Sequence, residues 1–202
     1  KRPREFLLQI DLAEVRAWGG PEWLPSSGRI YVFHDEERAG FADHACVLFT
    51  DNSPGAPPGV AAPPYRERRL TGRSYISFPS PDWLGVDGVE GDDEDLSEFI
   101  IEPAPVGPEG VHRLSGFPGE IQGGCMFVEC EYLARNLDMD DRTPMSDDMR
   151  EAAKSWRMLL QIDSDRDLKM NWWDSGRFYI FIREEDARAG DFSKTVTISQ
   201  TY

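Results

Sequence analysis

Apolar and polar side chains alternate in the same way in two distant parts of the chain. Residues 7–11 and residues 159–163 both read Leu-Leu-Gln-Ile-Asp, and this alternation is typical of a β-strand with one buried face. Residues 28–33 read Gly-Arg-Ile-Tyr-Val-Phe, and residues 176–181 read Gly-Arg-Phe-Tyr-Ile-Phe. Both alternating sets of that second motif are apolar, so we expect a central strand covered on both faces.

The order of the shared motifs indicates an internal duplication. A Glu-rich segment follows the second motif in each copy, and a run of β-forming residues then ends each copy. We therefore predict a single sheet-rich α+β domain spanning residues 1–202, with two three-strand units related by a pseudo-twofold axis. The first unit covers residues 5–50, the second covers residues 157–202, and residues 51–156 form a middle insert.

The middle insert differs in composition from the two units. Five prolines between residues 52 and 64 predict an extended surface excursion, and a strand is predicted over 74–78. The acidic residues 87–98 predict a solvated segment. Ser146 precedes two aspartates and an apolar stripe, which predicts a helix over 147–155. Residues 129–137 are predicted to form a second short helix.

Composition and charge narrow the class of protein. The 202 residues carry a formal net charge of −15 and are 40% hydrophobic, which is typical of a soluble folded chain. We expect no nucleic-acid partner, because such a surface repels phosphates. We expect no membrane span, because no apolar run reaches the roughly 18 residues that a span needs. Three cysteines are too few for a disulfide framework, so we expect a cytoplasmic protein with free thiols.

Four segments resemble the YwqG-like family, a bacterial domain family of unknown function. They are His-Arg-Leu-Ser-Gly-Phe-Pro at 112–118, Leu-Leu-Gln-Ile-Asp-Ser-Asp at 159–165, Trp-Trp-Asp-Ser-Gly at 172–176, and Tyr-Ile-Phe-Ile at 179–182. The family has Trp-Gly-Asp where this chain has Trp172, Trp173 and Asp174. The resemblance implies a sheet-rich α+β fold with an internal duplication. It also implies a segment upstream of residue 1 that this chain lacks, and it implies no activity.

Acidic residues after the 159–163 strand are candidate ligands for a hard cation. Asp163, Asp165 and Asp174 occupy loop positions at which a calcium loop places oxygen ligands. An EF-hand does not fit, because Leu168 replaces the glycine of its sharp turn and the flanking segments read as strands. Two interpretations stay open: a looser cation site, or aspartates that cap turns by accepting backbone hydrogen bonds.

The repeated Gln-Asp pairs are candidate ligand-binding residues. Gln9 and Asp11 share one face of the first strand, and Gln161 and Asp163 share the equivalent face of its copy. A polar cleft between the units would use these four side chains. The alternative is a buried polar network that fixes strand register. The remaining candidates for ligand contact are His112 and Trp172.

Two function hypotheses follow. The first is a non-enzymatic protein-binding module, immunity-like or antitoxin-like, whose negative charge attracts a basic protein partner. The second is a small-ligand-binding protein or enzyme with a polar cleft between the units. We expect no cofactor, since the chain has no glycine-rich phosphate loop and no nucleophile elbow. The catalytic residues of the second hypothesis are unknown.

Overall fold

The computed structural model describes most of both predicted units and parts of the middle insert. The described residues are 4–35, 44–51, 65–77, 79, 112–123, 125–139 and 144–202. The proline-rich residues 52–64 and the acidic residues 87–98 lie outside them. The predictions for those two segments therefore stay predictions.

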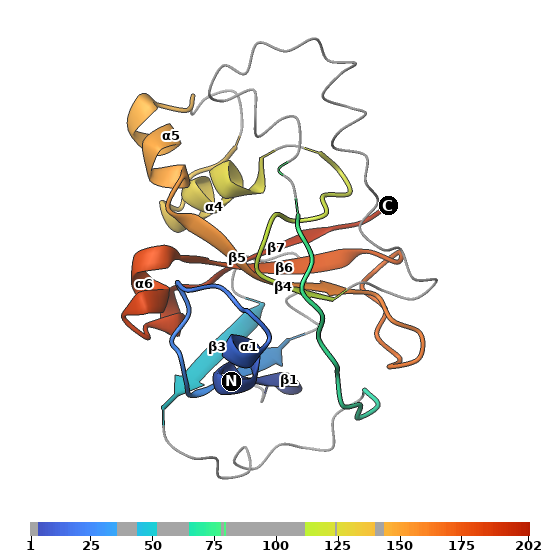
Figure 1. Ribbon diagram of the computed structural model, residues 1–202. Helices are drawn as coiled ribbons and strands as arrows, with labels where there is room; N and C mark the ends of the chain where they lie inside the picture. The colour runs from blue at the N-terminus through green and yellow to red at the C-terminus, as the bar shows by residue number, and fades with distance from the viewer. Residues whose placement is uncertain are drawn as a thin grey trace.

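The chain forms two antiparallel sheets, which confirms the predicted sheet-rich α+β fold (Figure 1). The first sheet has three strands in the order β1-β2-β3. These strands are β1 (Glu5–Asp11), β2 (Arg29–His34) and β3 (Ala45–Thr50). The second sheet has four strands in the order β4-β5-β6-β7. They are β4 (Arg113–Leu114), β5 (Trp156–Asp163), β6 (Arg177–Arg183) and β7 (Val196–Gln200).

Short helices flank the strands. The described helices are α1 (Leu12–Ala17), α4 (Met126–Ala134), α5 (Asp147–Ala153), α6 (Glu184–Arg188) and the 3₁₀-helix η2 (Phe192–Lys194). The predicted N-cap of α5 is confirmed, because the Ser146 hydroxyl accepts the Met149 N–H at 3.2 Å. Helix α4 begins three residues earlier than predicted. Within the described ranges, no helix combines the length and the hydropathy needed to cross a bilayer.

The two predicted units, which contain strands β1-β2-β3 and β5-β6-β7, share their strand pairing in detail. Leu8 pairs with Val32 and Gln9 with Tyr31, as Leu160 pairs with Ile180 and Gln161 with Tyr179. The register also shifts at the same place in each copy, between Phe6 and Leu8 and between Met158 and Leu160. A duplication would produce this shared pairing, and the duplication itself stays a prediction.

The main core lies between the two sheets. Ile30 and Val32 of the first sheet and Ile162, Phe178 and Ile180 of the second belong to one buried cluster. A second cluster fills the opposite face of the larger sheet, where α4 packs on Tyr179 and Phe181. Figure 1 shows the resulting order of layers, with the three-stranded sheet, the four-stranded sheet, and then α4 and α5.

A buried histidine joins the two sheets. His34, at the end of β2, is 1% exposed. Its ring stacks on Phe178 with 5.5 Å between centroids and meets Trp172 edge-on at 5.1 Å. Burial lowers the pKa of His34 to about 4, and nearby His44 contributes to this lowering. Neither ring nitrogen of His34 has a hydrogen-bond partner among the residues that the structure describes, so a proton there would be a buried charge without a hydrogen-bond acceptor.

We predict that His34 makes the protein less stable in mild acid. Between pH 6.5 and about 4 the unfolded chain binds a proton at His34 and the folded chain does not, so the free energy of unfolding falls as the pH falls. The loss should approach about 3 kcal/mol across that window. His34→Ile takes the residue of the equivalent position in the second copy, Ile182. Urea unfolding at several pH values should show a flatter profile for this variant, and an unchanged slope would contradict the assignment.

Candidate functional site

The candidate site lies on the outer face of the larger sheet, opposite the shared core. The apolar partners Leu160, Ile162 and Ile180 point into the core between the sheets. Side chains alternate along a strand, so Gln161 and Asp163 of β5 point to the outer face. The register places Tyr179 and Arg177 of β6 beside them. The segment 115–122, which follows β4, crosses this face.

Three side chains of the sheet bind the backbone N–H and C=O of Gly119. The Gln161 Oε1 accepts the Gly119 N–H at 2.8 Å. The Gly119 carbonyl accepts the Tyr179 hydroxyl at 2.7 Å and the Arg177 Nη1 at 2.9 Å. A Cβ at Gly119 would lie 3.3 Å from Nη1 of both Arg113 and Arg177, which is why glycine suits this close approach. We call Gln161, Asp163, Arg177, Tyr179 and Gly119 the Gln161 network.

The side-chain amide of Gln200, on β7 and therefore two strands away from Gln161, binds the same segment in a similar way. The Gln200 Oε1 on β7 accepts the Ile121 N–H at 2.6 Å and the Gln122 N–H at 3.2 Å. The irregular segment 115–122 therefore uses side-chain amides where a strand would use a backbone ladder. This satisfies part-buried backbone donors that would otherwise cost stability.

Charge in the Gln161 network is internally balanced. The Arg177 Nε donates to the Asp163 Oδ2 at 2.9 Å, and the Asp163 side chain is only 9% exposed. Burial alone would lower the pKa of Arg177, but Asp163 outweighs it and the pKa lies above its usual value. Burial raises the pKa of Tyr179, so its hydroxyl stays a hydrogen-bond donor at neutral pH. The network thus contains no open acid or base.

His112 and Trp172 meet at the end of β5. The His112 Nδ1 accepts the Asp163 N–H at 3.3 Å, and its Nε2 lies 3.3 Å from the Asp165 Oδ2. The Trp172 Nε1 donates to the Asp163 carbonyl at 3.0 Å. The structure therefore brings His112 close to Asp163 near Gln161, whereas the Trp172 ring lies in the shared core and reaches only the backbone carbonyl of Asp163.

Gln9 and Asp11 lie elsewhere. Leu8 and Ile10 pack on the shared core, so Gln9 points away from it and is exposed on the first sheet. Asp11 caps α1 by accepting the Ala13 N–H at 3.0 Å and pairs with Arg29 at 3.0 Å. The equivalent strand faces point to opposite sides of the paired sheets, so the structure does not bring Gln9 and Asp11 together with Gln161 and Asp163.

Two of the three candidate cation ligands bind other groups of the protein, and the third is exposed. The Asp163 carboxylate binds Arg177 and accepts the Ser164 N–H at 2.9 Å. Asp165 accepts the Leu168 N–H at 3.1 Å, and Asp174 is exposed. No group of three His, Cys, Asp or Glu side chains converges as a metal ligand set in the parts of the chain that the structure describes. The backbone hydrogen bonds of Asp163 and Asp165 are those of residues that cap turns.

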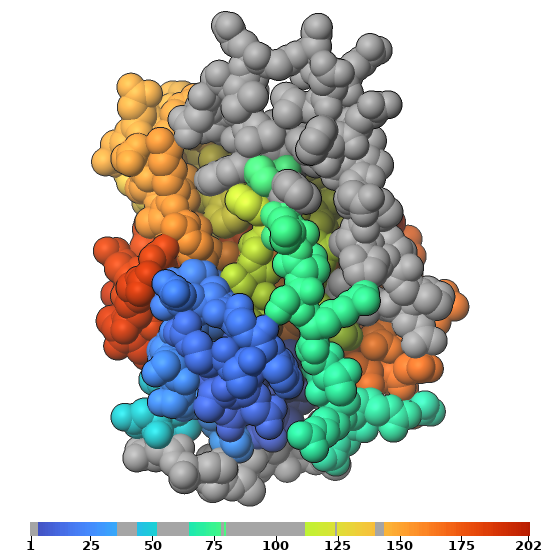
Figure 2. Space-filling view, in the orientation of Figure 1, coloured from blue at the N-terminus to red at the C-terminus, as the bar shows by residue number. Residues whose placement is uncertain are grey.

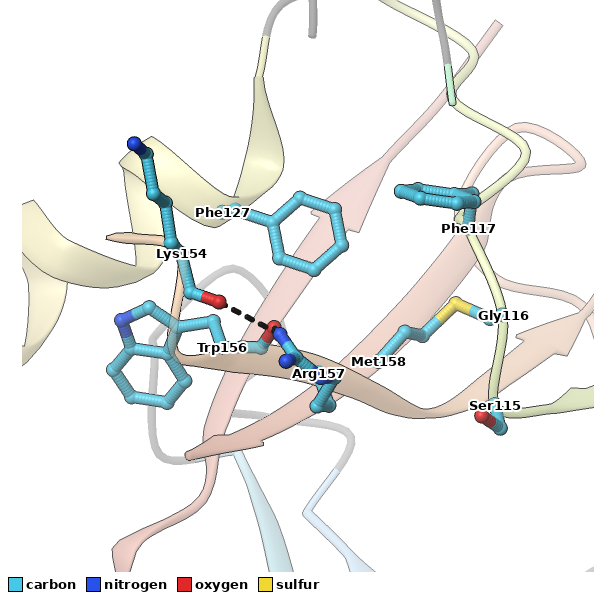
Figure 3. A pocket seen from close by; sticks show the side chains of 8 residues that line it. All are labelled: Ser115, Gly116, Phe117, Phe127, Lys154, Trp156, Arg157 and Met158. Atoms are coloured by element: carbon cyan, nitrogen blue, oxygen red, sulfur yellow. Dashed lines mark hydrogen bonds between the residues drawn. The ribbon is translucent and has the colours of Figure 1, made fainter. Parts of the chain in front are cut away.

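A small cavity that the sequence analysis did not predict lies beside residues 115–117. It encloses about 430 Å³ between this segment, α4 and the start of β5. Figure 3 shows its apolar side chains, with Lys154 and Arg157 among the lining residues. Both cations are already engaged, since Arg157 pairs with Glu184 at 2.8 Å and Lys154 with Glu151 at 3.1 Å. Its residues form no motif, so no sequence signal could have marked it.

Comparison with known proteins places the chain in one family. The sequence model of the family described as a domain of unknown function, DUF1963, matches residues 1–200. No curated protein matches the chain. The match covers both sheets and the Gln161 network.

We predict that Gln161 stabilises the fold and that its counterpart Gln9 does not. Gln161→Leu removes the acceptor of the Gly119 N–H and should lower the free energy of unfolding by about 1–3 kcal/mol. Gln9→Leu makes the same change at an exposed position and should alter it by less than about 0.5 kcal/mol. Urea unfolding of both variants measures the difference. Equal effects would contradict the assigned role of Gln161.

Arg177 and its counterpart Arg29 should also differ in how much they stabilise the fold. Arg177→Met removes the cation that balances the mostly buried Asp163 carboxylate and should lower the free energy of unfolding by about 3–5 kcal/mol. Arg29→Met breaks the pair with the 35% exposed Asp11 side chain and should cost less than about 1 kcal/mol. Thermal and urea unfolding at neutral pH compare them. A cost at Arg29 as large as at Arg177 would show that burial does not set the difference.

Proposed function

The chain belongs to the family described as a domain of unknown function, DUF1963, and we propose that it acts as a non-enzymatic protein-binding module. The observation that carries this proposal is the internal use of the candidate polar groups. Gln161 binds the Gly119 N–H, and Asp163 binds Arg177. A catalytic or ligand-binding cleft needs polar groups that face an open space, and these face the chain itself.

The same geometry weighs against the alternative of a polar cleft between the two units. That cleft required Gln9 and Gln161 to converge. Both sheets turn their apolar faces to the shared core, and the glutamines alternate with those apolar residues. The space between the units is therefore occupied by side chains such as Ile30, Val32 and Phe178.

The charge of the chain indicates the class of partner. The net charge is −15, and residues 81–111 contain ten Asp or Glu and no Lys or Arg. Such a concentration of negative charge speeds association with basic proteins. We infer a basic protein partner, as an immunity-like or antitoxin-like module would have.

The setting we infer is the bacterial cytoplasm. The segments 112–118 and 159–165 support a YwqG-like member of the family. The three cysteines are free thiols, which suits a reducing compartment.

We predict a salt-sensitive complex with a basic protein. Tagged full-length chain should retain such a protein from native-host lysate at about 50 mM NaCl, and its Kd by calorimetry should rise about tenfold by about 500 mM, where screening is strong. Neutralising D92N/D93N/D95N should weaken the complex, because it removes charge from the acidic segment. The matched control D147N/D148N/E151Q changes as many exposed acids on α5 and should leave the Kd within about twofold.

Two results would contradict this proposal. One is that no protein is retained at low salt. The other is a complex whose Kd is insensitive to salt and to both sets of substitutions, since neither attraction of opposite charge nor the acidic segment would then contribute.

A further inference from the structure

An extended segment crosses the surface of the molecule without joining either sheet. Residues 66–77, which we call the strap, belong to no helix or strand. The predicted strand over 74–78 is therefore not a sheet strand over its described residues 74–77. Figure 2 shows the strap, in green, running over the outside of the molecule next to the N-terminal unit.

Three contacts hold the strap in place along its length. The Arg66 N–H donates to the Leu168 carbonyl at 3.0 Å in the loop after β5. The Ser74 hydroxyl donates to the Trp18 carbonyl at 2.6 Å, at the end of α1. The Phe117 N–H donates to the Ser77 hydroxyl at 2.9 Å. Because these anchors belong to both units, the strap is fixed relative to the folded body.

The backbone of the strap is unpaired between its anchors. Within the described part of the chain, residues 67–77 make no backbone–backbone hydrogen bond. Residues 66–76 are all exposed. An extended run of free N–H and C=O groups that is already held in place is a template for strand addition.

The side chains of the strap indicate what kind of ligand would pair with its backbone. It carries four arginines and a single acidic residue, Glu67, in a chain whose net charge is −15. The Arg69 side chain is 90% exposed, and its ion pair with Glu14 spans 3.9 Å, so this contact is weak. The apolar residues Leu70 and Ile76 are 54% and 81% exposed. The four arginines are Arg66, Arg68, Arg69 and Arg73.

We propose that the strap binds an acidic, extended segment of a partner protein by strand addition. The backbone of the ligand pairs with residues 67–77, its carboxylates on one face meet Arg69 and Arg73, and its apolar side chains on the other face cover Leu70 and Ile76. A nucleic acid fits less well, because its phosphates cannot pair with the free backbone groups as a second β-strand does. The strap and the acidic residues 81–111 of the proposed function are different stretches of the sequence, and their tests use different ligands and different variants, so either proposal can fail alone.

Peptide binding to the full chain tests the proposal. The probe is a fluorescein-labelled peptide of alternating Glu and Val, followed by fluorescence anisotropy at about 50 mM NaCl, where screening is modest. We expect this peptide to bind and the matched Lys-Val peptide not to bind. A Glu-Val peptide with alternate N-methyl groups keeps the charge but loses ladder donors, and it should bind about tenfold more weakly.

Matched variants locate the binding surface. Arg73→Glu should weaken binding of the Glu-Val peptide about fivefold, whereas Arg150→Glu, an equal charge reversal at an exposed position on α5, should change it by less than about twofold. Amide hydrogen exchange over residues 67–77 should slow when the peptide is added. The proposal is overturned if the peptide does not bind, if both variants behave alike, or if single-stranded oligothymidylate binds more tightly without slowing exchange in the strap.

Discussion

Side chains on a β-strand alternate between two faces, and both sheets of this protein bury the side chains of equivalent positions in one shared core. Leu8 and Ile10 on β1, and Leu160 and Ile162 on β5, all point into one core between the sheets. The residues between and after them must then point outward. This constraint sends Gln9 and Gln161 to opposite sides of the paired sheets and decides every later feature of the candidate site.

Equivalent outward positions have different roles because only one sheet carries a covering segment among the described residues. On the larger sheet, residues 115–122 cross the outer face, and the peptide group of Gly119 binds Gln161, Tyr179 and Arg177. On the smaller sheet Gln9 is exposed, and Arg29 pairs with the partly exposed Asp11. The same residue types are therefore buried and structural in one unit and solvated in the other. The repeated polar residues of the second unit therefore stabilise the fold, and the recognition that we propose rests on the charged surfaces of the chain.

Local patterns predicted the elements, whereas contacts distant in sequence decided the site. Alternation located β1, β2, β5 and β6, and the Ser146 cap located α5, because each signal acts within a few residues. Helix α4 was placed three residues late because Cys125, which precedes it, makes no side-chain cap hydrogen bond. The meeting of His112, Asp163 and Trp172 at one strand end depends on how the chain returns to β5 from both directions, and no periodicity encodes that. The strand predicted over 74–78 is not a sheet strand at its described residues 74–77, because these residues pair with none of the strands that the structure describes.

The central claim is that the Gln161 network holds the segment 115–122 onto the sheet. Amide hydrogen exchange at Gly119 tests it most directly, because this N–H lies outside all helices and strands and has a side-chain acceptor at 2.8 Å. The account predicts that the Gly119 amide exchanges as slowly as amides in the centre of β5, through opening of the whole sheet. Exchange as fast as at exposed residues of the strap would show that the segment opens freely and would contradict the claim.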